Sequence, residues 1–249
     1  MIYQKIYQFC SVKNLGNCLS NTDDGSPRVS FILDLLKSLK INYKVDKFQY
    51  DRNKNIPLFN IILPGSGSHW CVAHHDIVNP ASDNANDNSC SVINLISLKL
   101  LRPDLNICFT DAEEIGGVGA QRLSDKILEG ELGPCDWILN LELSGRGGTN
   151  FFIGEYPGAL SDKIIQTFDP PIVRTPFNDS VVFRRNGIDS CVINPLPVLE
   201  SGRSEIQTKD GKYLDFNLLF NCHSKNDSLD KISPRDMSDF VEKILINIV

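Results

Sequence analysis

Apolar residues recur every three or four positions between residues 26 and 39, which is the spacing of a helix. Ser26 is a good N-cap and Pro27 suits the first helical position, so we predict that a helix begins there. From Ile41 to Tyr50 apolar and polar residues alternate instead, and this period of two predicts a strand.

Short apolar runs farther along the chain predict buried strands over residues 59–63, 70–73, 105–110, 137–141 and 188–193. Helices are predicted over residues 90–101, 116–128 and 233–249. Strands and helices thus alternate for most of the length, which predicts an α/β fold with a mostly parallel central sheet and helices on both faces. The sequence has no internal repeat and no long linker, so we expect a single domain over residues 1–249.

Composition excludes several classes of protein. The chain has 249 residues, of which 41% are hydrophobic and 22% charged, as is ordinary for a globular protein. It has no apolar run of about 18 residues and does not start like a secretory signal, so we expect a cytoplasmic protein without a membrane partner. The net charge of −6 and the lack of a lysine- or arginine-rich block argue against nucleic acid as a partner.

The eight cysteines are scattered along the chain and include no Cys-x-x-Cys pair. Several of them lie inside apolar runs. We therefore expect reduced, buried thiols rather than disulfides or a zinc site with sulfur ligands.

Histidine, aspartate or glutamate follows three of the predicted strands, at residues 74–76, 113–114 and 142. In parallel α/β folds, ligands bind at the carboxyl ends of the strands. The sequence therefore predicts a site of metal binding or catalysis at this edge of the sheet.

The first of these clusters is His74-His75-Asp76. Strand alternation places His74 and Asp76 on one side of the sheet and His75 on the other. A histidine with a carboxylate beside it suits a metal ligand and the residue that orients it. The alternative is a pair of surface histidines at the end of a strand.

Asp87 stands where a loop rich in Asn, Asp and Ser meets the next predicted helix. An aspartate in this place can simply be a helix N-cap. Its two carboxylate oxygens can also bridge a pair of metal ions, and the sequence alone leaves both interpretations open.

Glu113 and Glu114 are adjacent at the end of a predicted strand. Such a pair can divide two tasks, one glutamate binding a metal ion and the other taking a proton from water. Alternatively, both carboxylates complement the dipole of the helix that follows.

Glu142 and His223 also allow two interpretations each. Glu142 ends an apolar strand, and a buried carboxylate needs a cationic partner, which is either a metal ion or Arg146. His223 is a lone histidine near the C-terminal end, and it is either a metal ligand or a structural residue.

Taken in order, these motifs resemble those of the co-catalytic zinc aminopeptidase family, which includes glutamate carboxypeptidases and glutaminyl cyclases. The matching segments are Ala73-His-His-Asp76, Asn86-Asp-Asn-Ser, Ala112-Glu-Glu-Ile-Gly, Asn140-Leu-Glu142 and His223-Ser-x-x-Asp227-Ser-x-Asp-Lys-Ile. The similarity runs from about residue 60 to the C-terminus.

The resemblance implies the three-layer fold of zinc exopeptidases and two zinc ions (Zn2+) per chain. By family precedent, one ion is held by His74, Asp87 and Glu142, and the other by Asp87, Glu114 and His223. A ligand set of nitrogen and oxygen without thiolate suits zinc.

The resemblance also assigns roles to three residues that are not ligands. Glu113 is expected to be the general base, and Asp76 to orient His74 as part of the catalytic set. Asp179 lies in a stretch similar to the Ser-Asp-x stretch of the family, so we expect it to line the substrate cleft, with a helix N-cap as the alternative.

The sequence departs from the family pattern in three respects. Glu142 is one methylene longer than the usual aspartate, although related carboxypeptidases and deacylases have glutamate there. Cys222 stands where some members have a tyrosine that stabilises the oxyanion. The secretory signal of many relatives is missing, and only about 80 residues separate Glu142 from His223, which leaves little room for the inserted domain of some relatives.

Three functions are consistent with the sequence. The first is an aminopeptidase that removes the N-terminal residue of a peptide. The second is a related carboxypeptidase, deacylase or glutaminyl cyclase reaction at the same site. The third is a binding protein that kept the fold without catalysis, against which the presence of a free base at Glu113 argues. The preferred side chain and the oligomeric state are left open.

Overall fold

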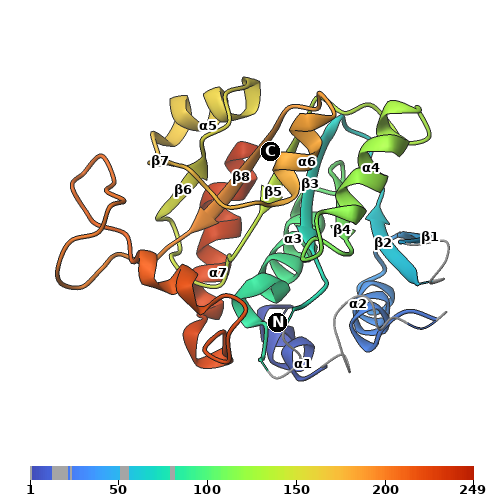
Figure 1. The fold of residues 1–249 in the computed structure, drawn as a ribbon, viewed down its shortest axis with the longest axis horizontal. Coiled ribbons are helices and arrows are strands. Elements are labelled where there is room, and N and C mark those ends of the chain that lie inside the picture. Colours follow the sequence, from blue (N-terminus) through green and yellow to red (C-terminus); the bar gives the residue numbers. More distant parts are fainter. Residues whose placement is uncertain (1, 13–21, 23, 51–55, 79–81) are drawn as a thin grey trace.

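The apolar runs of the sequence form the strands of one mixed sheet in the computed structural model, which describes residues 2–12, 22, 24–50, 56–78 and 82–249 (Figure 1). The strands are β1 (Lys44–Gln49), β2 (Pro57–Leu63), β3 (His69–His74), β4 (Asn106–Thr110), β5 (Trp137–Leu141), β6 (Phe151–Gly154), β7 (Ile172–Val173) and β8 (Ser190–Pro195). Their order across the sheet is β1-β2-β4-β3-β5-β8-β6-β7.

The four central strands are parallel, because β4, β3, β5 and β8 pair side by side in the same direction. The flanking pairs β1·β2, β2·β4 and β6·β8 are antiparallel, and β7 pairs with β6 in parallel. The predicted mostly parallel sheet is therefore confirmed in its centre. The carboxyl ends of the central strands meet at one edge, which is where the sequence predicts the site.

The helices of the described chain lie between these strands and at both ends of the sequence. The α-helices are α1 (Lys5–Ser11), α2 (Pro27–Ser38), α3 (Cys90–Leu101), α4 (Val118–Leu128), α5 (Ala159–Phe168), α6 (Asp179–Arg185), α7 (Pro234–Phe240) and α8 (Ile246–Ile248). Shorter 3-10 or π turns are η1 (Ile2–Gln4), η3 (Ala85–Ser89), η4 (Phe216–Asn221), η5 (Leu229–Lys231) and η6 (Val241–Leu245).

Alternate residues of the central strands β3 and β5 pack into two different cores, one on each face of the sheet. Cys71 and Leu139 pack in the larger core, with side chains of α1, α2, α3, α5 and α7. Val72 and Ile138 point the opposite way and pack against α4 and α6. Helices thus cover both faces of the sheet, as the period-two pattern of the strands requires.

Several elements differ from the sequence predictions. The predicted strand 41–50 is the shorter edge strand β1, and the C-terminal helix begins at Pro234 and continues through η6 and α8. The segment from β6 to α6 was not predicted, because β6 and β7 are only four and two residues long. After β8 the chain leaves the sheet as the orange extension on the left of Figure 1.

The cysteines in the described ranges are all free thiols, and five of these seven are buried. Cys18 lies outside the described residues. A search of the described helices for one long and apolar enough to cross a membrane finds none.

Candidate metal and catalytic site

The predicted site residues converge at the carboxyl edge of the sheet. His74 is the last residue of β3, and Glu142 directly follows β5. Asp87 lies in η3, just before α3, and Glu114 lies in the turn between β4 and α4. His223 arrives from a different part of the chain, two residues after η4.

Asp87 lies between the two histidines. Its Oδ1 is 3.2 Å from Nε2 of His74, and its Oδ2 is 3.2 Å from Nε2 of His223. His74 Nε2 is also 3.4 Å from Oε2 of Glu142, and His223 Nε2 is 2.9 Å from Oε2 of Glu114. The Nε2 atom of each histidine therefore lies near one oxygen of Asp87 and near one further carboxylate, that of Glu142 or of Glu114.

These side chains form two groups that can each hold a cation. The first group is His74, Asp87 and Glu142, and the second is Asp87, Glu114 and His223. In each group the ligand atoms, one nitrogen and two carboxylate oxygens, lie within 4.8 Å of one another. This donor set suits zinc, with open positions left for water or substrate.

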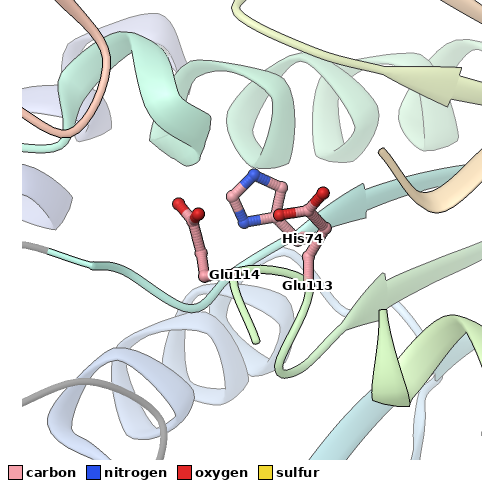
Figure 2. A group of neighbouring side chains, drawn as sticks. All are labelled: His74, Glu113 and Glu114. Atoms are coloured by element: carbon pink, nitrogen blue, oxygen red, sulfur yellow. The ribbon is translucent and has the colours of Figure 1, made fainter. Parts of the chain in front are cut away.

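A third combination of His74, Glu113 and Glu114 has the same spacing. Figure 2 shows the two glutamates reaching from the turn after β4, with their carboxylates on opposite sides of the His74 imidazole. The two adjacent glutamates thus lie in different parts of the site. Glu114 contacts His223, whereas Glu113 belongs to neither of the two groups that share Asp87.

The charge balance of the site fits a bound divalent cation. Burial raises the pKa of Glu113 well above its usual range, although His74 opposes this shift. Burial and the nearby Asp87 raise the pKa of Glu114 to about 8. The hydrogen bond to Asp87 raises the pKa of His223 to about 9. Carboxylates outnumber the histidines in this buried space, and cations would supply the missing positive charge.

Asp76 connects the first histidine to the paired glutamates. Its Oδ1 is 3.4 Å from Nδ1 of His74, on the ring edge that faces away from Asp87. Its carboxylate also accepts hydrogen bonds from the backbone N–H groups of Glu113 (3.1 Å) and Glu114 (3.2 Å). Asp76 thus fixes both the imidazole and the turn that carries the two glutamates.

Left-handed backbone conformations accumulate around the site. Ala112, Leu143 and His223 have φ values of 62°, 54° and 61°. The first two adjoin Glu113 and Glu142, so the chain turns sharply at each strand end. Non-glycine residues adopt this region at a cost, and such residues are concentrated at functional sites.

The turn after β4 is held by a buried asparagine and a close helix contact. Asn60 of β2 accepts from the N–H of Asp111 and donates to the carbonyl of Gly119. A Cβ on Gly119 would lie 2.4 Å from the carbonyl oxygen of Asp111, so only glycine permits this approach. The glycines after Glu114 therefore let α4 begin directly beside the strand end.

Asp227 holds the loop that presents Asp87. Its carboxylate accepts from the N–H groups of Asn86 (2.7 Å) and Asp87 (3.0 Å). The helix α3 starts only at Cys90, with Ser89 at its N-cap position. Asp87 faces the two histidines with its carboxylate oxygens and does not cap that helix.

Glu142 receives amide donors instead of the arginine that the sequence offered as an alternative. Asn88 donates to its Oε2 (2.7 Å), and Asn140 donates to its Oε1 (3.1 Å). Arg146 lies near Asp236, with Nε 3.8 Å from Oδ2 of that residue. The longer glutamate is thus fixed by two asparagines with one oxygen beside His74.

Asp179 occupies a different place from either of its expected ones. The helix α6 is capped by Asn178, whose side chain accepts from the N–H of Ser180. Asp179 is fully buried and accepts from the hydroxyl of Thr110 at 2.6 Å. Asn178 lines the cavity beside the site, and Asp179 is not among its lining residues.

That cavity measures about 400 Å³ and opens next to the cluster. Its apolar lining comes from Leu143, Phe152, Pro176, Phe177, Val192 and Leu219. Its uncharged polar lining comes from Thr175, Asn178, Asn194 and Cys222. No lysine or arginine is found among the described residues that line it.

Arg28 was not predicted as part of the site, but it connects two of the segments that carry the site residues. This residue of α2 is 1% exposed, and its guanidinium lies 4.0 Å from the ring centre of Phe9. It donates to the carbonyl of His75 and to the hydroxyl of Ser89, both at 2.9 Å. Arg28 thereby ties the end of β3 to the loop that carries Asp87. Arg28 precedes Ile32 by four residues, and residues at this spacing lie on the same face of a helix. The sequence therefore already indicates that Arg28 lies on the buried face of α2.

We expect Arg28→Met to lower the free energy of unfolding by about 2–4 kcal/mol, because two buried acceptors lose a charged donor. Lys37→Met changes an exposed cation on the same helix and should alter stability by less than about 0.5 kcal/mol. Urea unfolding of the three proteins measures this difference. Equal stability of the two variants would contradict the bracing role.

Histidine and carboxylate groups that share an aspartate at the carboxyl edge of an α/β sheet form the kind of site found in metal-dependent hydrolases. A comparison with protein-family models matches residues 64–247, well over half of the chain, to Peptidase family M28. The chain belongs to this family of peptidases. The family expected from the motifs is confirmed.

Solved structures with the same fold include two aminopeptidases and a glutaminyl cyclase. The LapA aminopeptidase of Legionella pneumophila is 13% identical, with a TM-score of 0.71 over 99% of this chain and 68% of that chain. A glutaminyl cyclase from an Acidobacteriales bacterium is 19% identical, with a TM-score of 0.71 over 99% and 92%. BSAP, a zinc aminopeptidase from Bacillus subtilis, is 19% identical, with a TM-score of 0.58 over 78% and 49%. The search among curated proteins gave no match.

Proposed function

We propose that this chain is a zinc-dependent aminopeptidase, which removes the first residue of a peptide. The observation that carries the proposal is the position of Asp87, whose two oxygens each face a different histidine. This supports two zinc ions, one held by His74, Asp87 and Glu142 and the other by Asp87, Glu114 and His223. A pair of ions in such a site supplies polarisation of the substrate carbonyl and activation of a water molecule.

Glu113 is the general base in this proposal. It is 8% exposed and lies beside His74, yet it belongs to neither of the two groups that share Asp87. Its carboxylate takes the proton of the attacking water and delivers it to the leaving nitrogen. Asp76 keeps Glu113 in place through its backbone N–H and holds the imidazole of His74 in one orientation.

The lining of the cavity favours a free amino end over a free carboxyl end. A carboxypeptidase needs a cation to pair with the terminal carboxylate, and neither lysine nor arginine occurs among the described lining residues. The described lining thus offers no cationic partner for a terminal carboxylate, whereas a free amino end needs none. The aminopeptidases among the structural neighbours point the same way.

Glutaminyl cyclisation is a second candidate, because a glutaminyl cyclase is among the solved structures with the same fold. A cyclase acts on an N-terminal glutamine and releases ammonia without cutting the peptide. Mass spectrometry of a peptide that begins with glutamine therefore distinguishes the two reactions.

Leucine p-nitroanilide and its N-acetyl derivative form a matched pair of substrates for the proposed activity. With zinc added, we expect the free amine to be hydrolysed at least about a hundredfold faster, because binding of the ammonium group contributes to the transition state. Hydrolysis of the N-acyl bond of N-acetylated amino acids, at a higher rate than any free-amine substrate, would assign the chain to the deacylases. Inactivity on all free-amine substrates would refute the aminopeptidase.

A further inference from the structure

Two neighbouring strands supply the floor of the cavity. Phe152 of β6 lies opposite Asn194 of β8 in the ladder, and Val192 lies two residues before Asn194 on the same face. All three line the cavity, whereas Ile193 between them points into the larger core. Among these three strand residues, Phe152 and Val192 are apolar and Asn194 alone presents an amide group.

The orientation of this amide follows from its neighbour. Asn194 is 4% exposed, and its Nδ2 lies 3.3 Å from the carbonyl oxygen of Glu142. A backbone carbonyl only accepts hydrogen bonds, so the NH2 group must face Glu142 and the oxygen must be the other amide atom. This Oδ1 is buried and has no hydrogen-bond partner anywhere in the described chain.

The other amide and the hydroxyl of the cavity lining are already paired. Asn178 donates to the carbonyl of Pro176 and accepts from the N–H of Ser180. Thr175 accepts from Asn178 and shares a hydrogen bond with the hydroxyl of Tyr156. Asn194 therefore has the open acceptor on this side of the cavity, and an unpaired buried acceptor is unfavourable until a donor reaches it.

We propose that Asn194 is a specificity-determining residue, whose Oδ1 accepts a hydrogen bond from the first side chain of the substrate. The donor is an uncharged hydroxyl or amide group. A charged ammonium also donates, but its burial against the apolar walls of Leu143, Phe152 and Leu219 would remove its hydration, which is unfavourable. This inference rests on the proposed aminopeptidase function and names the substrate class within it. The class is peptides whose first side chain carries an uncharged hydrogen-bond donor, as in threonine, glutamine or tyrosine.

Three matched pairs of aminoacyl p-nitroanilides test the proposal: Thr against Val, Gln against Met, and Tyr against Phe. Within each pair the shapes are close and only one member has a donor. We expect the donor member to have at least about tenfold higher kcat/KM in one or more pairs, because a site built to hydrogen-bond its substrate rejects the analogue that lacks the donor. The donors of Thr, Gln and Tyr lie at different distances from the α-carbon. The pair that shows the preference therefore indicates the distance between Asn194 and the scissile bond.

Asn194→Leu should abolish the preference, so that the ratio of kcat/KM within the responding pair falls to about one. Because this change also removes the donor to the carbonyl of Glu142, zinc content is measured alongside, and Asn194→Ala serves where the leucine variant does not fold. Thr175→Val is the matched control, since its hydroxyl is already paired and the ratios within each pair should stay the same.

Equal rates within all three pairs for the parent enzyme would overturn the proposal. So would a donor preference that persists in a zinc-loaded Asn194 variant. Failure of the proposed aminopeptidase function gives a different result, because neither member of any pair would then be cleaved. In that case the proposed specificity of Asn194 would also be rejected.

Discussion

Glu113→Gln is expected to lower kcat by about a hundred- to ten-thousandfold, the usual contribution of a positioned general base. Glutamine has the same shape, and the N–H of residue 113 can still donate to Asp76. Its side-chain amide cannot take up a proton from water. The loss should therefore appear in kcat for every substrate, while the number of zinc ions bound per chain stays as in the parent enzyme.

Zinc content distinguishes the base from a ligand, because His74, Glu113 and Glu114 also have the spacing of a metal site. A fall in bound zinc in Glu113→Gln would make Glu113 a ligand. Glu129→Gln is the control, since this exposed glutamate lies at the far end of α4 and should keep full activity. Parent-like kcat in Glu113→Gln with zinc retained would remove Glu113 from the mechanism.

The strand-end residues were predictable because strands constrain their neighbours in sequence. An apolar run that stops at a polar residue marks both the end of the strand and the edge of the sheet. This is why His74 and Glu142 could be assigned to one edge before their contacts were known. The period of two also separated His74 from His75, whose Nε2 donates to the carbonyl of Phe59 on β2, with β4 lying between β2 and β3 in the sheet.

The antiparallel edges of the sheet were not predictable in the same way. β6 and β7 are too short for a period to show, and their pairing depends on β8, which lies about 40 residues after β6. Contacts between distant segments leave no local pattern. Asp227 is an example, because nothing near it in sequence indicates that it holds the N–H groups of Asn86 and Asp87.

Arg28 and Asn194 were missed for a different reason. Both are polar residues on buried faces, where the period of the element indicates burial but not the partner. Arg28 contacts the carbonyl of His75, and Asn194 contacts the carbonyl of Glu142. Each side chain acts through a backbone atom of a strand end, and backbone acceptors do not depend on residue type. The partners of such residues, unlike their burial, are known only from the tertiary structure.

Asp87→Ala is expected to reduce bound zinc from two ions per chain to fewer than one, and to bring hydrolysis to background. The reason is that Asp87 belongs to both groups, whereas every other ligand that we propose belongs to one. Glu142→Ala and His223→Ala should each leave about one ion, because each removes a ligand from a single group. Elemental analysis after equilibrium dialysis against limiting zinc measures all four proteins under one condition.

Stability measurements with and without zinc complete this test. An ion present at 100 times its dissociation constant stabilises the native state by about 2.7 kcal/mol. The melting temperature of the parent should therefore rise on addition of zinc, and that of Asp87→Ala should hardly change. His223→Ala is the most informative partner, since its side chain is 55% exposed and its loss should disturb folding least. If His223→Ala lost both ions, or if Asp87→Ala kept both, the two centres would not share Asp87.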